Sequence, residues 1–212
     1  MRITVFGAAG QVGSRVVAEA LHRGHQVTAV LRTPARAAEI PREAEIRIGD
    51  AADRDDIADL LDGQDLAIGA TRPAAGRENE LITATASLTA GAARAGVRLL
   101  LVGGAATLTV PGTGGVTVMD EPGFPATLRA IARACAGQLA VCRAATETDW
   151  TYLSPPAQLY AGRRTGRYRL GRDMLVVDRD GESVLSYEDL AVVLLDEAER
   201  PAHRGIRFTA AY

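Results

Sequence analysis

Residues 1–13 read MRITVFGAAGQVG, and this stretch decides the fold. A short β-rich run, Ile3 to Phe6, leads into three glycines spaced as GxxGxxG, namely Gly7, Gly10 and Gly13. In the dinucleotide-binding turn the first glycine permits a sharp turn, the second lets backbone approach a pyrophosphate, and the third allows close helix–strand packing. Glycine is common in turns of many kinds. It is the position of these glycines between a strand and a helix that predicts dinucleotide binding.

The rest of the chain alternates strand and helix patterns. Strands are expected at 26–31, 45–48, 65–68, 97–102 and 150–153, and helices at 11–23, 53–61, 77–95 and 126–145, with a helical turn at 35–39. Strands separated by helix-length segments imply right-handed crossovers and a parallel sheet covered on both faces. The predicted fold class is α/β, a Rossmann-like doubly wound parallel sheet.

After Ser154 the pattern changes, beginning with the pair Pro155-Pro156. Short strands joined by Asp180-Gly181 are expected within 173–184, and a last strand at 206–208. Ser186 followed by Asp189 resembles a capping box for a helix over 187–199. We expect one domain, 1–212, in which 154–212 is a small appendage over the cofactor edge of the sheet. The glycine-rich stretch 110–125 is the one long loop expected.

All 24 basic residues are arginine, and the chain has no lysine. This excludes Schiff-base chemistry, a Walker-type phosphate lysine and a Tyr/Lys catalytic pair, because arginine does not release a proton at ordinary pH. A net charge of -2 argues against nucleic-acid and membrane partners. A small-molecule substrate, a cytoplasmic location and a monomer or homodimer are expected.

Two cysteines lie seven residues apart on one expected helix, Cys135 and Cys142, so their Cα atoms should be roughly 10 Å apart, beyond disulfide reach. The three histidines are scattered, so no metal site is expected.

The residues after the second strand bear on the choice of nicotinamide cofactor. An acidic residue there would bind the ribose 2′-hydroxyl, whereas this chain has Arg32 and, four residues later, Arg36. If both guanidinium groups converge on one phosphate, the cofactor is NADP; as solvated surface arginines they would leave NAD possible. Asp50 either binds the adenine amino group or caps the following helix. The small residues Gly69, Ala70 and Thr71 would admit the cofactor ribose.

Several stretches together resemble one family: GAAGQVG, RGHQV, LRTP, Gly49-Asp50, LLVGGAATL, WTYLSPP and SYEDLAVVLLDEAERP. They are similar to the atypical short-chain dehydrogenase/reductases, in particular the NmrA-like, flavin-reductase-like branch related to biliverdin reductase B. The resemblance covers the whole chain and implies a NAD(P)-binding Rossmann fold. It also implies a small conjugated or flavin-like substrate over the nicotinamide.

Family roles carry over only where the motifs match. The resemblance assigns cofactor binding to residues of the phosphate loop, of the arginine pair and of the following strand ends: Gly7, Ala9, Gly10, Gln11, Val12, Gly13, Arg32, Arg36, Asp50, Gly69, Ala70, Thr71, Gly103, Pro155 and Pro156. The tyrosine and lysine of standard members fall near Arg133 and Gly137, so that proton relay is missing here.

The candidate catalytic residue is Thr107, at or next to the position where relatives place a serine that binds a substrate carbonyl. The alternatives are that Thr107 only satisfies the strand end, or that Ala106 is the true counterpart. Asp120 and Glu121 could act as acids but are more typical of solvated loop charges. Met119, Phe124 and Tyr160 are candidates for an apolar substrate pocket, with core packing as the alternative.

These observations predict an NADPH-preferring reductase of a flavin, quinone or other conjugated small molecule, acting by direct hydride transfer. Two alternatives stay open. One is a non-catalytic, NADP-sensing NmrA-like regulator, which would bind the cofactor without turnover. The other is a redox-neutral isomerase or cyclase, which would form product without net cofactor oxidation.

Overall fold

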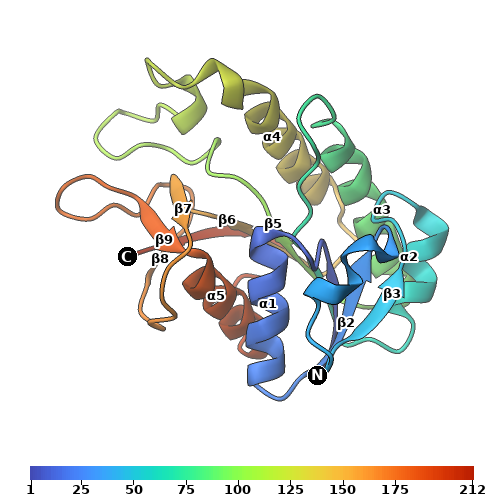
Figure 1. Ribbon diagram of the computed structural model, residues 1–212. Helices are drawn as coiled ribbons and strands as arrows, with labels where there is room; N and C mark the ends of the chain where they lie inside the picture. The colour runs from blue at the N-terminus through green and yellow to red at the C-terminus, as the bar shows by residue number, and fades with distance from the viewer.

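A central sheet of eight strands organises the computed structural model, which describes residues 1–212 (Figure 1). Its strand order is β3-β2-β1-β4-β5-β6-β10-β8, the doubly wound order expected. The strands are β1 (Arg2–Phe6), β2 (Gln26–Leu31), β3 (Glu45–Ile48), β4 (Leu66–Gly69), β5 (Arg98–Val102), β6 (Trp150–Ser154), β8 (Arg169–Gly171) and β10 (Arg207–Ala211). The predicted Rossmann-like parallel sheet is confirmed, with one antiparallel pair at its edge, where β8 pairs with β10.

Five α-helices cover the sheet in two layers. On one face lie α1 (Gln11–His22) and α5 (Tyr187–Glu199); on the other lie α2 (Arg54–Leu61), α3 (Glu80–Ala95) and α4 (Arg129–Ala144). Strand alternation divides the core between the layers. In β1, Ile3 and Val5 pack in the core with α1 and α5, whereas Phe6 packs with α2 and α3.

The register of β1 brings the candidate cofactor residues to one edge. Phe6 pairs with Val30 of β2 on one side and with Gly69 of β4 on the other. Because these strands are parallel, the residues that follow them meet at the carboxyl edge of the sheet. Gly7, Arg32 and Ala70 therefore come from three segments to the same place.

Several predicted boundaries shift. The helix expected from Arg77 begins at Glu80, after a turn in which the Glu80 N–H donates to the Arg77 carbonyl. The helix expected from Ala126 opens as a 3₁₀ turn, η3 (Ala126–Leu128), before α4.

The strands expected within 173–184 are wrong: the edge of β10 is taken by β8, and Met174 makes only a bridge to Thr109. The turn expected at Asp180-Gly181 is present, with Gly181 at φ +83°. A two-stranded ribbon, β7 (Gln158–Tyr160) with β9 (Val184–Ser186), completes the appendage.

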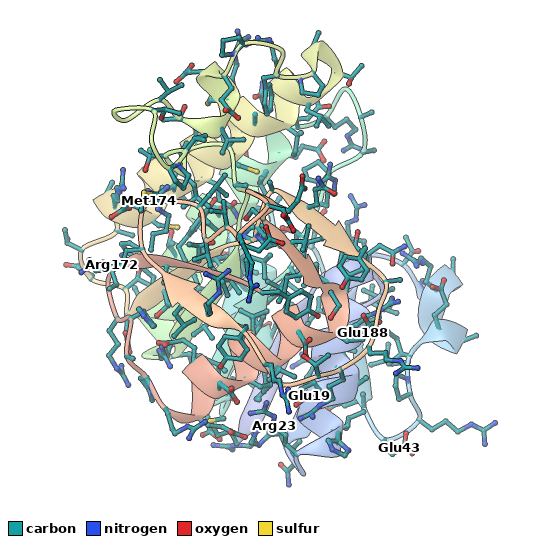
Figure 2. The ribbon with its side chains drawn as sticks, turned by 90° about the vertical axis from the view of Figure 1, so that its left-hand side faces the viewer. Glu19, Arg23, Glu43, Arg172, Met174 and Glu188 are labelled. Atoms are coloured by element: carbon teal, nitrogen blue, oxygen red, sulfur yellow. The ribbon has the colours of Figure 1, made fainter.

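Residues 161–168 form a strap that joins β7 to β8. Arg164 binds Glu19 of α1 through two hydrogen bonds of 2.7 and 2.9 Å. The buried carboxylate of Asp189 accepts hydrogen bonds from the N–H groups of Thr165 and Gly166, both at 2.8 Å. Figure 2 shows Glu188, Glu19 and Arg23 following one another along this part of the molecule.

The strap explains why the expected capping box is only half formed. The Ser186 hydroxyl does accept from the Asp189 N–H at 3.0 Å. The Asp189 carboxylate, however, is turned toward the strap, and the Ser186 N–H donates to the Tyr212 hydroxyl at 3.3 Å instead. A tertiary contact has therefore replaced the local one.

Candidate functional site

The three glycines of the phosphate loop each have little or no room for a side chain. Gly7 has φ +78°, and a Cβ there would lie 2.5 Å from the Ala70 carbonyl oxygen. A Cβ on Gly13 would lie 2.1 Å from the Gly7 carbonyl oxygen. A Cβ on Gly10 would meet only the Gly7 carbonyl oxygen closely, at 3.1 Å. The loop therefore packs tightly against β4 and α1 while leaving the outer side of Gly10 open.

The N-terminus of α1 has no side-chain cap. Gly10 is its N-cap residue, with extended backbone angles, so the N–H groups of Gln11, Val12 and Gly13 have no partner within the helix. Free N–H groups and the positive end of the helix dipole suit a pyrophosphate. The loop residues thus fit the phosphate groups of a dinucleotide.

The two arginines after β2 have different surroundings. Arg36 lies in the 3₁₀ turn η1 (Pro34–Glu39), close to the helical turn predicted. It donates through Nη2 to the Ala9 carbonyl oxygen at 2.7 Å and forms an ion pair with Glu39. Arg32 is exposed and has no carboxylate within 4.0 Å. Glu39 lies three residues further along the same 3₁₀ turn, so the Arg36 guanidinium is paired with a carboxylate and that of Arg32 is not.

Asp50 follows β3 but does not cap α2. The capping residue is Asp53, whose carboxylate accepts from the N–H groups of Asp55 and Asp56. Asp50 is exposed, and one of its carboxylate oxygens accepts from the Ala52 N–H at 2.9 Å. Helix capping, one of the two roles considered for Asp50, is thus performed by Asp53.

Two glycines assigned to the cofactor site also have no room for a side chain in the core. A Cβ on Gly69 would lie 2.6 Å from the Leu101 side chain, and a Cβ on Gly103 would lie 1.9 Å from the Tyr152 ring. Their neighbours Ala70 and Thr71 are partly exposed at the carboxyl edge. Pro155 and Pro156 are buried where β6 ends.

Helix α4, where relatives place tyrosine and lysine, offers no such pair. Arg133 is exposed, and Gly137 packs against Ile82 of α3. The tyrosine beneath this helix, Tyr152, is buried, and its hydroxyl lies 3.1 Å from both the Cys135 carbonyl and the Gln138 side-chain oxygen. Burial raises the pKa of Tyr152 well above its usual range, so this hydroxyl is a structural group.

Cys135 and Cys142 are both free thiols. Cys135 faces the segment after β5, since a Cβ on Gly104 would lie 2.8 Å from its sulfur. Burial raises the pKa of the Cys135 thiol, and the charge of Arg72 partly offsets this. Arg72 follows β4 and has no ion-pair partner, so it adds positive charge beside the segment Gly103–Thr107.

Thr107 is held by an arginine that the sequence patterns did not single out. Arg207 of β10 donates through Nη1 to the Thr107 hydroxyl at 2.7 Å and to its carbonyl at 3.2 Å. Asp173 accepts from Nε of the same guanidinium at 3.0 Å. A charged residue at the start of a buried strand, RFTAA, is the sequence feature that could have pointed to Arg207.

The substrate-pocket candidates lie on two sides of the carboxyl edge. Met119 and Phe124 are partly buried in the loop before α4, where Arg129 lies over the Phe124 ring, 5.8 Å from its centroid. The Met119 N–H donates to the Ala106 carbonyl at 3.0 Å, next to Thr107. Tyr160 is 46% exposed on β7 of the appendage. Figure 1 shows the loop and β7 on either side of the ends of β5 and β6.

A cavity of about 340 Å³ lies at the opposite, amino edge of the sheet, lined by Met1, Asp65, Arg98, Asp149 and Arg204 among others. None of the residues assigned to cofactor binding, catalysis or the substrate pocket lines it, and ion pairs such as Arg204–Asp149 cross its wall. No cluster of three metal-binding side chains occurs. None of the helices is both long and apolar enough to cross a bilayer.

Three solved structures resemble this chain over its full length. They are a candidate exported protein from Burkholderia pseudomallei (38% identity, TM-score 0.90, covering 100% of both chains) and a candidate epimerase from Bacteroides thetaiotaomicron (36%, 0.90, 100% of this chain and 96% of that one). The third is a candidate NADH-flavin reductase from Streptococcus pneumoniae (30%, 0.90, 100% and 99%).

A family model described as NAD(P)H-binding matches residues 7–201. The matched range begins at the first glycine of the phosphate loop and ends just after α5, so it includes every cofactor residue predicted from the sequence. The chain therefore belongs to the NAD(P)H-binding family, within its atypical short-chain dehydrogenase/reductase and NmrA-like branch, and its cofactor is a nicotinamide dinucleotide.

Proposed function

We propose that this protein is an NADPH-preferring reductase that transfers a hydride directly to a flavin, quinone or other conjugated small molecule. The observation that carries the proposal is the combination of a glycine-lined phosphate loop before α1 with a helix α4 that has neither tyrosine nor lysine. The first feature binds the cofactor, and the second removes the proton relay that alcohol dehydrogenation needs.

The protein's contribution in this reaction is binding and orientation. A bound reduced nicotinamide supplies the hydride. The free N–H groups at α1 hold the pyrophosphate, and the segments after β4, β5 and β6 position the ring end of the dinucleotide. Conjugated acceptors take a hydride without prior protonation and then acquire a proton from water. Such a reaction therefore does not require the Tyr/Lys pair that α4 lacks.

The preference for NADPH rests on Arg32. This guanidinium is exposed, free of carboxylates and placed directly after β2, where a 2′-phosphate would lie. Glu39 accepts from Nε and Nη2 of Arg36, so Nη1 is the nitrogen of this guanidinium that can add a second contact while the ion pair stays in place. Arg32 is thus the principal determinant of the NADPH preference. The carboxylate of Glu39 opposes binding of the negatively charged 2′-phosphate nearby.

Mixing the purified protein with NADPH and a panel of flavins and quinones tests the activity. We expect loss of the reduced-nicotinamide absorbance with at least one acceptor, faster with NADPH than with NADH. The candidate NADH-flavin reductase from Streptococcus pneumoniae supports including flavins in the panel. No oxidation above background with any acceptor would refute the proposal.

A redox-neutral activity is the second candidate, since the similar Bacteroides thetaiotaomicron protein is a candidate epimerase. Its distinguishing result is product formation with no net change in the ratio of reduced to oxidised cofactor. The same absorbance assay, combined with product analysis, separates the two candidates.

A further inference from the structure

The buried guanidinium of Arg207 is 7% exposed and links three parts of the chain. Arg207 is the first residue of β10, and its side chain lies on the α4 face of the sheet. Its register partner in β6 is Tyr152, which packs in the core on that face. On one side it binds Asp173, which follows β8. On the other it binds Thr107, which follows β5. Figure 2 labels Arg172 and Met174, the neighbours of Asp173, on the appendage.

The Thr107 hydroxyl group donates no hydrogen bond within the protein. Its oxygen accepts from Arg207, but no protein group accepts its proton. Thr107 is partly exposed, whereas Arg207 behind it is buried. Since a threonine hydroxyl donates one hydrogen bond, its proton is available to a ligand on the open side.

The sheet face next to Arg207 is also polar. Ser154 and Thr209 are register partners in β6 and β10, both are fully buried, and neither side-chain oxygen has a hydrogen-bond partner. Buried hydroxyls without partners are rare in folded proteins and call for water or a ligand nearby. Together with Thr107 and Arg207 they make this end of β6 and β10 an incomplete polar site.

We propose that Thr107 donates a hydrogen bond to the acceptor atom on which negative charge develops, and that Arg207 is the positioning residue that orients and polarises this hydroxyl. The inference rests on the proposed function, because it names the group that stabilises the negative charge developing on the hydride acceptor.

The step balances without a protein acid. The hydride adds to the acceptor with its electron pair, and the displaced π electrons move to an acceptor oxygen or nitrogen. That atom accepts the hydrogen bond from Thr107 and then takes a proton from water, which leaves as hydroxide. Thr107 keeps its own proton, so Arg207 acts by stabilising the developing charge.

The test uses the complete protein without cofactor and 4-nitrophenol as a flat probe whose phenolate form absorbs visible light. We expect wild-type protein to bind the phenolate more tightly than the phenol, which lowers the pKa of the bound probe. Thr107→Val should abolish this preference and Thr107→Ser should retain it. Thr113→Val is the matched control, since the Thr113 hydroxyl bonds only the Val110 carbonyl on the same loop.

Arg207→Gln should reduce the preference, and thermal melting will show whether that variant is folded. Thr107→Val is near in shape to threonine and partly exposed, so it tests the proposal even if Arg207→Gln unfolds. In NADPH oxidation, Thr107→Val should lower kcat by about 10²-fold with little change in KM for NADPH.

Wild-type protein that binds both forms of the probe equally, or neither, overturns the proposal even if the reductase activity is present. A retained phenolate preference with no NADPH oxidation would instead refute the proposed function and leave the Thr107 site in place. The two failures are therefore distinguishable.

Discussion

Arg36 donates a hydrogen bond to the Ala9 carbonyl, with 2.7 Å between its Nη2 and the oxygen, so that residues 27 positions apart are joined across the phosphate loop. Glu39 holds the same guanidinium from the other side. This arrangement fixes the loop between β2 and β3 over the start of α1. Arg32, in contrast, has no carboxylate partner.

The Arg32→Ala variant should bind NADPH roughly tenfold less tightly and NADH with little change, because a charge-assisted contact to the 2′-phosphate is lost. Fluorescence titration with both reduced cofactors measures this. The companion variant Glu39→Gln should tighten NADPH binding by freeing Arg36. Equal weakening for NADH and NADPH in Arg32→Ala would contradict the assignment.

Two glycine variants should separate folding from cofactor binding. Gly13→Ala places a Cβ against the Gly7 carbonyl and should lower the free energy of unfolding by about 1–3 kcal/mol. Gly10→Ala makes a less severe contact, 3.1 Å from the Gly7 carbonyl oxygen, and should cost less stability than Gly13→Ala, yet its methyl group would hinder the close approach of the pyrophosphate. Urea unfolding and cofactor titration of both variants check this contrast. Unchanged NADPH affinity in Gly10→Ala would count against phosphate binding at this loop.

Tyr152→Phe should cost about 1–3 kcal/mol of stability, because the one proton shared between the Cys135 carbonyl and the Gln138 side-chain oxygen is lost. The rate of NADPH oxidation at saturating substrate should stay close to that of wild type. Since the pKa of Tyr152 is raised by burial, its phenol should also stay protonated in an alkaline absorbance titration until the protein unfolds. A large loss of kcat in a folded Tyr152→Phe protein would assign this residue to the chemistry after all.

The buried pair of Arg98 and Glu197 should make stability depend on pH. Burial raises the pKa of Glu197, but hydrogen bonds from His203, Ala202 and Arg98 more than offset this, so its pKa lies below the ordinary value of 4.5. A carboxyl with a lowered pKa stabilises the fold above its unfolded pKa, and this contribution is lost as the pH falls through its folded value.

Glu197→Gln should therefore cost about 3–5 kcal/mol near neutral pH, because Arg98 is left buried without its counter-charge. It should also flatten the fall in stability between about pH 5 and pH 2. Urea unfolding across this range measures both effects. The exposed pair Arg77–Glu80 offers a control, since Glu80→Gln should change stability by less than about 1 kcal/mol.

The sequence by itself determined the Rossmann-like architecture and the place of the phosphate loop. Gly7, Gly10 and Gly13 are informative because backbone angle and close approach are local requirements that few residues meet. The alternation of strand and helix patterns predicted most element boundaries, because hydrophobic periodicity is also a local property of the sequence. The absence of lysine by itself excludes the usual proton relay.

Only the tertiary structure decided how distant polar residues pair. It joined Arg36 to the Ala9 carbonyl, turned Asp189 toward the strap and joined Thr107 to Arg207 across 100 residues of sequence. It also showed that Gly103 makes room for the Tyr152 ring. Such pairings depend on which strands lie side by side and on which buried groups still need a partner. These are properties of the packed core, and no spacing along the chain encodes them.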